Sequence, residues 1–300
     1  MKNFLSIQDA TDLNALIEKA MAYKANPHAD SEKGKNKTLG LLFFNSSLRT
    51  RLSTEIAAQN LGMKVIGFSN QQAWNLEFVE GAVMDQQNAE HIIEAAGVLS
   101  RFVDILGVRS FPELVDRTYD YSEPVLSGFQ KYLDIPLVNL ESATMHPLQS
   151  LADLMTIREL QKAKKPKVVL TWAPHPRALP QSVPNSFASC MLAAGMELTI
   201  AHPEGLELAG DFTEGATVTN DQQKAFEGAD FIYAKNWSSY QEYGKGTSLH
   251  GDWMIDGKKL NLTNDARFMH CLPVRRNIVV ADEVLDSKNS VVLQQAQNRI

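Results

Sequence analysis

The stretch TLGLLFFNSSLRTR, residues 38–51, decides the fold class because it reads as a buried strand that passes into a helix. Its first part, TLGLLFF, is largely apolar and carries no charge, as expected for a strand covered on both faces. A polar turn follows, and a helix is predicted to begin at about Ser47. The N–H groups at a helix start lack partners and carry the positive end of the helix dipole. This junction therefore favours an anion.

Two kinds of side chain support the anion-binding hypothesis. Ser47 and Thr50 add hydroxyl donors, while Arg49 and Arg51 add forked guanidinium donors that suit phosphate oxygens. The alternative is a capped surface helix whose arginines point into solvent. The local pattern alone leaves both interpretations open.

The same alternation of strand and helix continues along the whole chain. Strands are predicted at residues 38–44, 64–68, 104–109, 136–140, 167–172, 197–202, 230–235, 267–272 and 290–293. Helices are predicted at residues 49–61, 91–102, 148–163 and 183–194. Such alternation is typical of parallel sheets covered by helices. We therefore expect an α/β protein with two doubly wound parallel-sheet domains and its active site in the cleft between them.

Composition argues against several classes of protein. The 300 residues carry a formal net charge of -6, whereas nucleic-acid binders normally present a basic face. The two cysteines, Cys190 and Cys271, fit a reducing compartment. No stretch reaches the ~20 apolar residues of a membrane span. We expect a cytoplasmic protein with neither a nucleic-acid nor a membrane partner.

The sequence also lacks the glycine-rich phosphate loop, the dinucleotide fingerprint, the zinc-protease helix and the nucleophile elbow. No cofactor and no metal are therefore expected. The missing fingerprint disfavours a nicotinamide-dependent oxidoreductase, which is an alternative on a similar fold.

Two further motifs place polar groups where predicted strands end. TMHPLQSLADL, residues 144–154, puts His146 and Gln149 within one turn of a helix start. Either could donate a hydrogen bond to a carbonyl oxygen that gains negative charge, although His146 could also be a structural cap. FMHCLPVRRN, residues 268–277, ends a strand in a Cys-Leu-Pro turn. Cys271 could be a nucleophile, but we favour the backbone carbonyls of the turn as acceptors for an amine substrate.

A fourth motif, TWAPHPRALPQSVPNSF at residues 171–187, contains four prolines. Because proline fixes φ and removes a donor, the motif predicts a stiff, irregular loop after a strand. Such a loop could be a lid or substrate loop, or simply a rigid connector.

Together and in this order, these motifs resemble those of the aspartate/ornithine carbamoyltransferase family. The likeness covers essentially the whole chain and rests on SLRTR (47–51), HPLQSLADL (146–154), HCLP (270–273) and QNRI (297–300). It implies a carbamoyl-phosphate-binding domain at residues 1–147, to which residues 286–300 return, and an N-acylornithine-binding domain at 148–285. Family members continue past the position of Ile300 into a C-terminal helix, and a missing helix there would affect stability more than chemistry.

The resemblance also implies roles for individual residues. Carbamoyl phosphate would be bound by Ser47, Leu48, Arg49, Thr50, Arg109, His146, Gln149, Cys271, Leu272 and Arg299, with Trp74 reaching across from a neighbouring subunit of a homotrimer. Thr50, Arg109 and His146 would polarise the carbamoyl oxygen, and Cys271 belongs to the same catalytic group. Gln149 would hold the carbamoyl NH2. The leaving phosphate can accept the proton of the amine, so no protein base is implied.

One departure from the family pattern narrows the expected substrate. Where ornithine enzymes carry a Ser-Met-Gly loop, this chain reads YAKNWSSY at residues 233–240, which resembles the branch that acts on N-acylated ornithine. An acylated α-nitrogen is neutral and needs no acidic partner, and Lys235 would pair with the α-carboxylate. The implied binding residues are Ala89, Glu141, His175, Arg177, Lys235, Cys271, Leu272 and Arg275.

The proline-rich segment at residues 173–187 and HPLQS at 146–150 look closer to the branch of the family that acts on N-succinylornithine than to the N-acetylornithine branch. The resemblance therefore implies N-succinylornithine as the substrate, with Arg275 and Arg177 as candidate partners for its second carboxylate. N-acetylornithine is the alternative, and arginine biosynthesis is the implied context. A catalytically silent homologue is the alternative from a different class. The intact set of Ser47, Arg109 and His146 argues against it.

Overall fold

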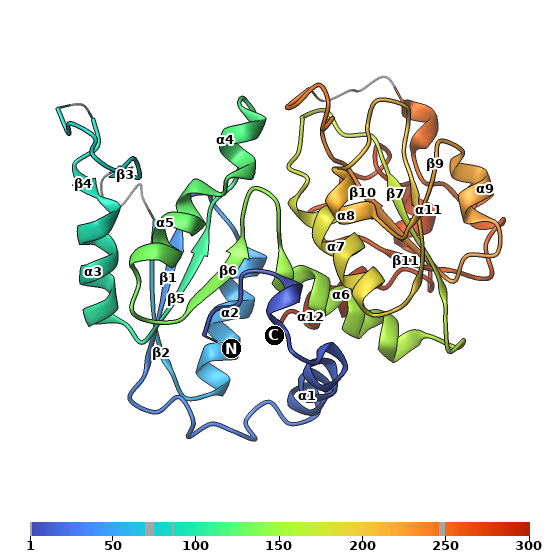
Figure 1. Cartoon of the computed structure of the whole chain (residues 1–300). Coiled ribbons are helices and arrows are strands. Elements are labelled where there is room, and N and C mark those ends of the chain that lie inside the picture. The colour runs from blue at the N-terminus through green and yellow to red at the C-terminus, as the bar shows by residue number, and fades with distance from the viewer. Residues whose placement is uncertain (1, 70–74, 86, 246–249) are drawn as a thin grey trace. The chain divides into compact units, whose positions relative to one another are not determined.

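The computed structural model describes residues 2–69, 75–85, 87–245 and 250–300, and Figure 1 shows its elements along the chain. The chain divides into two compact units. The first comprises the chain up to Glu113, Thr118–Leu148 and Arg299–Ile300, and the second comprises Leu114–Arg117 and Gln149–Asn298. Each unit is built on one parallel sheet, which confirms the predicted class of a two-domain α/β protein.

The sheet of the first unit has four strands in the order β2-β1-β5-β6. The strands are β1 (Thr38–Phe43), β2 (Lys64–Ser69), β5 (Ile105–Arg109) and β6 (Leu137–Glu141). The helices that precede α6 are η1 (Ile7–Asp9), α1 (Leu13–Ala25), α2 (Arg49–Asn60), α3 (Ile92–Phe102), α4 (Arg117–Tyr121) and α5 (Pro124–Tyr132). Two short parallel strands, β3 (Leu76–Glu77) and β4 (Glu90–His91), form a separate ladder.

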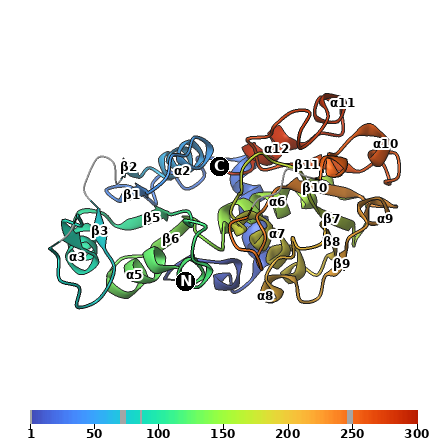
Figure 2. The same ribbon diagram turned by 90° about the horizontal axis from the view of Figure 1, so that it is seen from above.

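Both faces of this sheet are covered, because β1 alternates its apolar side chains between them. Leu41 packs with Ala58 of α2 on one face. Its neighbour Leu42 packs with Ile92 of α3 and Phe129 of α5 on the other face. Figure 2 shows α2 on one side of the sheet and α3 and α5 on the opposite side. This two-sided burial explains why β1 reads as a continuous apolar run rather than as an alternating one.

The sheet of the second unit has five strands in the order β11-β10-β7-β8-β9. The strands are β7 (Lys167–Trp172), β8 (Glu197–Ala201), β9 (Thr217–Thr219), β10 (Phe231–Lys235) and β11 (Arg267–Met269). The helices are α6 (Pro147–Leu160), α7 (Ser182–Ala193), α8 (Gly210–Thr213), α9 (Gln222–Phe226), η3 (Gly251–Trp253), α10 (Gly257–Leu260), α11 (Asp282–Leu285) and α12 (Val292–Gln297). Both views place α6 and α7 on one side of the sheet and α9 on the other (Figures 1 and 2).

Aromatic side chains fill the core of the second unit. Trp172, Tyr233 and Phe187 are fully buried, and the rings of Phe187 and Tyr233 lie 4.2 Å apart between centroids. Within the described residues, none of the helices combines the length and apolar character that a membrane crossing requires.

The predicted strand at residues 290–293 is wrong. Only Ser290 forms a bridge there, with Phe268, and helix α12 begins at Val292. The two adjacent valines suggested a strand because β-branched residues favour sheets. Tertiary packing prevails instead, since helical spacing buries Val292 together with Gln295, whose side chain joins a buried polar network.

The return of residues 286–300 to the first unit is limited to Arg299–Ile300. The preceding residues belong to the second unit, because polar side chains from the C-terminal segment bond to α6. Gln294 Nε2 and Asn298 Nδ2 both donate to Glu159 Oε2, at 2.8 and 3.0 Å.

Candidate active site

The junction of β1 and α2 lies at the carboxyl end of the first sheet, where Phe43 pairs in register with Arg109 of β5. Helix α2 begins at Arg49, slightly later than the predicted start at about Ser47, and Leu48 is its N-cap residue. Thr50 is buried within the first turn. The junction therefore presents a helix start at a strand end, as the sequence predicted.

The arginines of this junction differ in their surroundings. Arg51 Nε donates to Glu55 Oε1 at 2.9 Å on the exposed side of α2, so the surface-helix interpretation holds for Arg51. Arg49 and Ser47 are half-buried, whereas Leu48 is exposed. Ser47, Arg49 and Thr50 remain the candidates for phosphate contacts.

Arg109, the last residue of β5, is held by acceptors from two neighbouring segments. Its Nε and Nη2 donate to Glu141 Oε2 at the end of β6, at 3.2 and 3.0 Å. Its Nη1 donates to the backbone oxygens of Asn45 and Ser46, at 3.1 and 2.9 Å. The guanidinium also lies 4.0 Å from the centroid of the Phe111 ring. These contacts fix a buried charge in one position beside the β1–α2 junction.

His146 and Arg299 complete the group in the first unit. Arg299 Nη2 donates to Thr50 Oγ1 at 3.2 Å, and its Nη1 lies 3.4 Å from His146 Nε2. His146 Nε2 also lies 3.6 Å from Glu141 Oε2. The structure thus brings together Thr50, Arg109, Glu141, His146 and Arg299, which come from four separate parts of the sequence.

Burial lowers the pKa of His146 well below its usual range, and the positive charges of Arg299 and Arg109 lower it further. The imidazole is therefore neutral at neutral pH. A neutral imidazole carries one N–H donor and one acceptor, so it can polarise a carbonyl oxygen without supplying a full charge.

Gln149 and the 270–272 turn belong to the second unit. Gln149 is buried on α6, and its Nε2 donates to Asp153 Oδ1 at 2.7 Å. Leu272 adopts a positive φ of 57°, and its N–H donates to His270 Nδ1 at 2.9 Å. The side chain of Cys271 lies beside Tyr233, whose pKa is raised well above its usual value mainly by burial.

The second unit also gathers three residues that were assigned to an acylated amino acid. Arg275 Nε donates to His175 Nε2 at 3.1 Å, and His175 Nδ1 lies 3.0 Å from the backbone oxygen of Arg177. The N–H of Arg177 also lies 3.2 Å from His175 Nδ1, so both backbone polar groups of Arg177 face this nitrogen. Burial lowers the pKa of His175, and the nearby cations Lys235, Arg275 and Arg177 lower it further.

Lys235 ends strand β10 and is buried, with its Nζ donating to Asn236 O at 3.0 Å. The proline-rich motif forms an irregular segment after β7, and α7 then begins at Ser182. Pro184 lies in the first turn of α7, where its missing N–H costs no helical hydrogen bond. The motif is therefore part loop and part helix start.

Two candidates from the sequence lie in or beside the segment between β2 and α3. Trp74 falls outside the described residues. Ala89 is exposed, and its N–H donates to Asn75 O at 3.1 Å next to the β3–β4 ladder.

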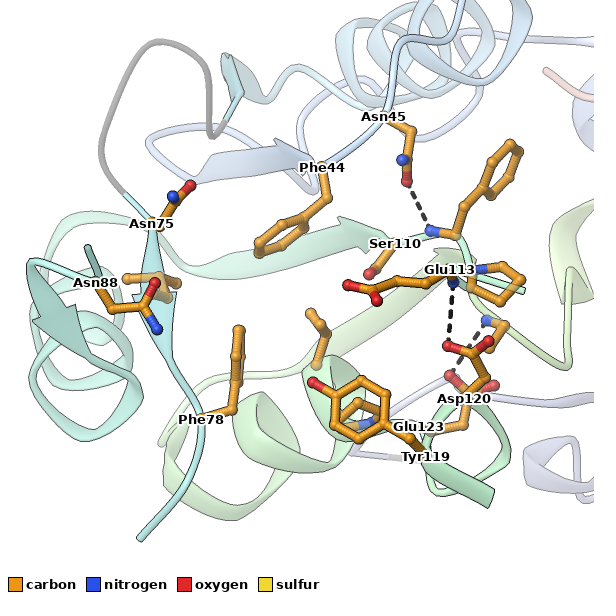
Figure 3. A pocket seen from close by; sticks show the side chains of 16 residues that line it. Phe44, Asn45, Asn75, Phe78, Asn88, Ser110, Glu113, Tyr119, Asp120 and Glu123 are labelled. Carbon is orange, nitrogen blue, oxygen red and sulfur yellow. Dashed lines mark hydrogen bonds between the residues drawn. The ribbon is translucent and has the colours of Figure 1, made fainter. Parts of the chain in front are cut away.

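A pocket of about 520 Å³ in the first unit adjoins the Arg109 group. Asn45 connects the two, because its backbone oxygen accepts from Arg109 while its Oδ1 accepts from Phe111 N at 2.6 Å. Figure 3 shows Phe44 and Phe78 on one side of the pocket and Glu113 and Tyr119 opposite them. Of the described residues that line it, none is a lysine or an arginine.

No pattern in the sequence indicated this pocket, since its lining comes from segments that are distant along the chain. Asp153 and Gln295 were also missed as site residues. Asp153 lies within the quoted HPLQSLADL motif, four residues after Gln149, so helical spacing was a usable signal for it. No local signal pointed to Gln295.

Parallel strands that end beside a helix start, with a buried arginine and a neutral histidine, are typical of an α/β enzyme, and the helix start suits an anionic ligand. Among the described residues, no group of His, Cys, Asp and Glu is arranged to hold a metal ion.

Comparison with known proteins identifies the family. The carbamoyl-P binding domain of aspartate/ornithine carbamoyltransferase matches residues 2–159, and the Asp/Orn binding domain matches residues 180–300. The chain is 51% identical to the N-succinylornithine carbamoyltransferases of Bacteroides thetaiotaomicron and Bacteroides fragilis, over all of this chain and 95% of each relative. It is 37% identical to the N-acetylornithine carbamoyltransferase of Xylella fastidiosa, over all of this chain and 96% of that protein.

A solved structure agrees with these relatives. The crystal structure of an N-acetyl-L-ornithine transcarbamylase mutant complexed with carbamyl phosphate and N-succinyl-L-norvaline superimposes with a TM-score of 0.94 at 36% identity, covering all of this chain and 96% of that one. The chain belongs to the aspartate/ornithine carbamoyltransferase family. The resemblance deduced from the four motifs is therefore confirmed.

Proposed function

We propose that this enzyme transfers the carbamoyl group of carbamoyl phosphate to the δ-amine of N-succinyl-L-ornithine, giving N-succinyl-L-citrulline and phosphate. The 51% identity to N-succinylornithine carbamoyltransferases, against 37% to an N-acetylornithine carbamoyltransferase, supports the succinyl derivative. In this proposal the first unit supplies the groups for carbamoyl phosphate, and the second unit supplies those for the acylated ornithine.

The observation that carries the proposal is the arrangement around Arg109. A guanidinium has five N–H donors. Among the residues that the structure describes, Glu141, Asn45 and Ser46 take four of them, which leaves one hydrogen on Nη2 for a ligand oxygen. A donor fixed in advance stabilises the charge that develops on the carbamoyl oxygen, because it does not have to reorganise during the reaction.

The phosphate would occupy the start of α2, with Thr50 and Arg299 as its best-defined side-chain partners. These two side chains already touch each other at 3.2 Å, so a phosphate oxygen bound between them would meet a hydroxyl and a guanidinium. The half-buried Ser47 and Arg49 and the backbone of Leu48 would complete the contacts. Neutral His146 would share the carbamoyl oxygen with Arg109.

The acylated ornithine would be bound by residues of the second unit together with Glu141. Lys235 would pair with its α-carboxylate, and the backbone oxygens of Cys271 and Leu272 would accept from its amine. Arg275 and Arg177 flank His175, and together they would hold the second carboxylate of a succinyl group. Ala89 would lie near the acyl group. An acetyl group has no such carboxylate and would leave these cations without a partner.

The reaction follows from these positions. The neutral δ-amine attacks the carbamoyl carbon, the bond from that carbon to the phosphate oxygen breaks, and the departing phosphate takes the proton of the amine. A δ-amine has an ordinary pKa of ~10, so the neutral form must be selected or favoured on binding. Orientation and oxyanion stabilisation then supply most of the rate.

We further propose that the active form is a homotrimer in which Trp74 reaches the carbamoyl phosphate of a neighbouring subunit. The enzyme would act in the cytoplasm, in arginine biosynthesis. Light scattering during size-exclusion chromatography tests the assembly, and a fully active monomer would remove the role of Trp74 in a neighbouring site.

The decisive experiment is a parallel assay of the ureido product with ornithine, N-acetylornithine and N-succinylornithine, each with carbamoyl phosphate. We expect the highest kcat/KM with N-succinylornithine and very little product from free ornithine. A preference for N-acetylornithine would replace the proposed acceptor and leave the carbamoyl transfer intact. No product from any of the three would refute the proposed reaction.

A further inference from the structure

A buried polar network in the second unit connects two segments that the proposed reaction uses. Asp153 Oδ1 accepts two hydrogen bonds of 2.7 Å, one from Gln149 Nε2 and one from Gln295 Nε2. Gln149 and Asp153 are four residues apart on α6, whereas Gln295 on α12 is 142 residues from Asp153. One carboxylate oxygen therefore holds two amides from distant parts of the chain.

The chemistry of a carboxylate fixes which way each amide faces. Both bonds end on Asp153 Oδ1, which accepts them, so the group of each amide that faces this oxygen is the NH2 and not the carbonyl. The oxygen of each glutamine must then point away from Asp153. For Gln149, this orientation presents an acceptor, which is what the carbamoyl NH2 requires.

The other amide continues the network to the 270–272 turn. Gln295 Oε1 accepts from the backbone N–H of His270 at 3.0 Å. His270 Nδ1 in turn accepts from Leu272 N at 2.9 Å. The network therefore runs from Gln149 through Asp153 and Gln295 to the turn whose backbone carbonyls were assigned to the amine substrate.

The four side chains of the network are shielded from water. Asp153 and Gln295 are fully buried, and Gln149 and His270 are almost so. In such surroundings a hydrogen bond is stronger and a lost partner is costly, so one orientation of each amide is strongly preferred. Asp153 can thus set the geometry of both segments without touching a substrate.

We propose that Asp153 is a positioning residue that orients Gln149 toward the carbamoyl NH2. Through Gln295, Asp153 also holds the 270–272 turn in a fixed position relative to Gln149. This role rests on the proposed function. It also assigns a purpose to Gln295, which no motif in the sequence singled out.

The test compares two ligands that differ in the group to which Gln149 would bond. Carbamoyl phosphate has an NH2, whereas inorganic phosphate does not. Replacing Asp153 with leucine (Asp153→Leu) removes the acceptor at nearly constant size, so calorimetry should show binding of carbamoyl phosphate weakened ~10- to 100-fold and binding of phosphate unchanged. Asp153→Asn keeps one oxygen and should restore part of the affinity for carbamoyl phosphate. Equal losses of affinity for both ligands would show that Asp153 is merely structural. No loss of affinity for either ligand would show that Asp153 does not position Gln149. Either result would overturn the proposal.

A second variant decides the question if Asp153→Leu does not fold. Gln295→Met removes the bonds to Asp153 and to His270 and should raise the KM for N-succinylornithine ~10-fold. The matched control is Gln222→Met, since Gln222 is also a buried glutamine of the second unit, with its Nε2 bonded to Thr171 Oγ1 at 2.8 Å. The control should keep the wild-type KM, and the same KM in both variants would overturn the proposal.

The wild-type enzyme separates failure of this proposal from failure of the proposed function. Wild-type protein that forms no ureido product with any ornithine derivative would overturn the function, and the positioning role with it. The positioning role alone would be overturned if the wild type is active but Asp153→Leu binds carbamoyl phosphate and phosphate with equal losses, or Gln295→Met has the same KM as Gln222→Met.

Discussion

In the first unit Arg109 is fixed by a buried ion pair with Glu141, whereas in the second unit the neutral amide of Gln149 is fixed by the hydrogen bond that it donates to Asp153. The two arrangements suit different parts of one proposed substrate. In the proposed reaction a charged donor would face the oxygen that gains negative charge, and an oriented neutral amide would face an NH2 that does not change its charge. The comparison indicates that a charged side chain is used where the reaction develops charge. A neutral side chain is used where only the direction of a hydrogen bond matters.

The largest expected effect tests the charged side of this comparison. Arg109→Ala removes the donor aimed at the carbamoyl oxygen and should lower kcat/KM by ~100- to 1,000-fold, or about 2.7–4 kcal/mol of barrier. Because the change also leaves Glu141 buried without its partner, Arg109→Lys is measured beside it. Lysine keeps the positive charge but lacks the forked donors of a guanidinium, so a smaller loss of kcat/KM is expected. Near-normal turnover of folded Arg109→Ala, checked by circular dichroism, would remove Arg109 from the catalytic role.

The next effect concerns charge used for recognition in the second unit. Arg275→Met removes the cation bonded to His175 and should raise the KM for N-succinylornithine ~10- to 100-fold, while KM for N-acetylornithine changes little. Steady-state kinetics with the two derivatives measures the difference. Equal changes in the KM of both derivatives would show that Arg275 does not bind the second carboxylate.

A smaller effect is expected from His146 when the pH is lowered from 7.5 to 6.5. The neutral form of the δ-amine falls about tenfold over this range, since its ordinary pKa is ~10. The pKa of His146 lies well below its usual value in the folded protein, so the imidazole stays neutral and should add less than about twofold to the resulting fall in kcat/KM. The unfolded chain takes up this proton near its ordinary pKa of about 6.5. Stability from His146 is therefore present above pH 6.5 and is lost as the pH falls toward the lowered folded-state pKa. Proton NMR of the imidazole, with His146→Gln for assignment, follows the titration, and a midpoint near 6.5 would contradict the buried neutral form.

The smallest effect should come from an arginine of the first unit that takes no part in the site. Arg101 is exposed at the end of α3 and bonds only within its own helix turn, to Gly97 O, among the residues described. Arg101→Ala should leave kcat/KM and the melting temperature unchanged, as measured by the ureido assay and calorimetry. A loss close to that of Arg109→Ala would mean that total charge, rather than placement, governs activity.

The sequence predicted the parts of the site that lie immediately after strands. Parallel strands end at one edge of a sheet, so Arg109, Glu141 and Lys235, the last residues of β5, β6 and β10, could be placed from the order of the elements. The motifs then supplied the expected chemistry. Eight of the predicted strands are present, because short apolar runs of this kind had no competing helical pattern.

The rest depends on contacts across long stretches of chain. Gln295 meets Asp153 across 142 residues, and nothing in the local sequence around Gln295 shows that partner. The same segment was mistaken for a strand, since the valines at 291 and 292 favour a sheet while the glutamine bonds that hold α12 are tertiary. The pocket beside Asn45 was missed for the same reason, as its lining joins the segment that follows β5 to the segment around Phe78.

The single hydrogen left on Arg109 Nη2 has a consequence for the design of inhibitors. An oxyanion that offers two parallel oxygens can form no second bond to this guanidinium, because the remaining donors are already taken by the protein. Analogues with one well-placed oxygen should therefore gain as much at this position as carboxylates do, and added negative charge there would bring desolvation cost without a matching contact.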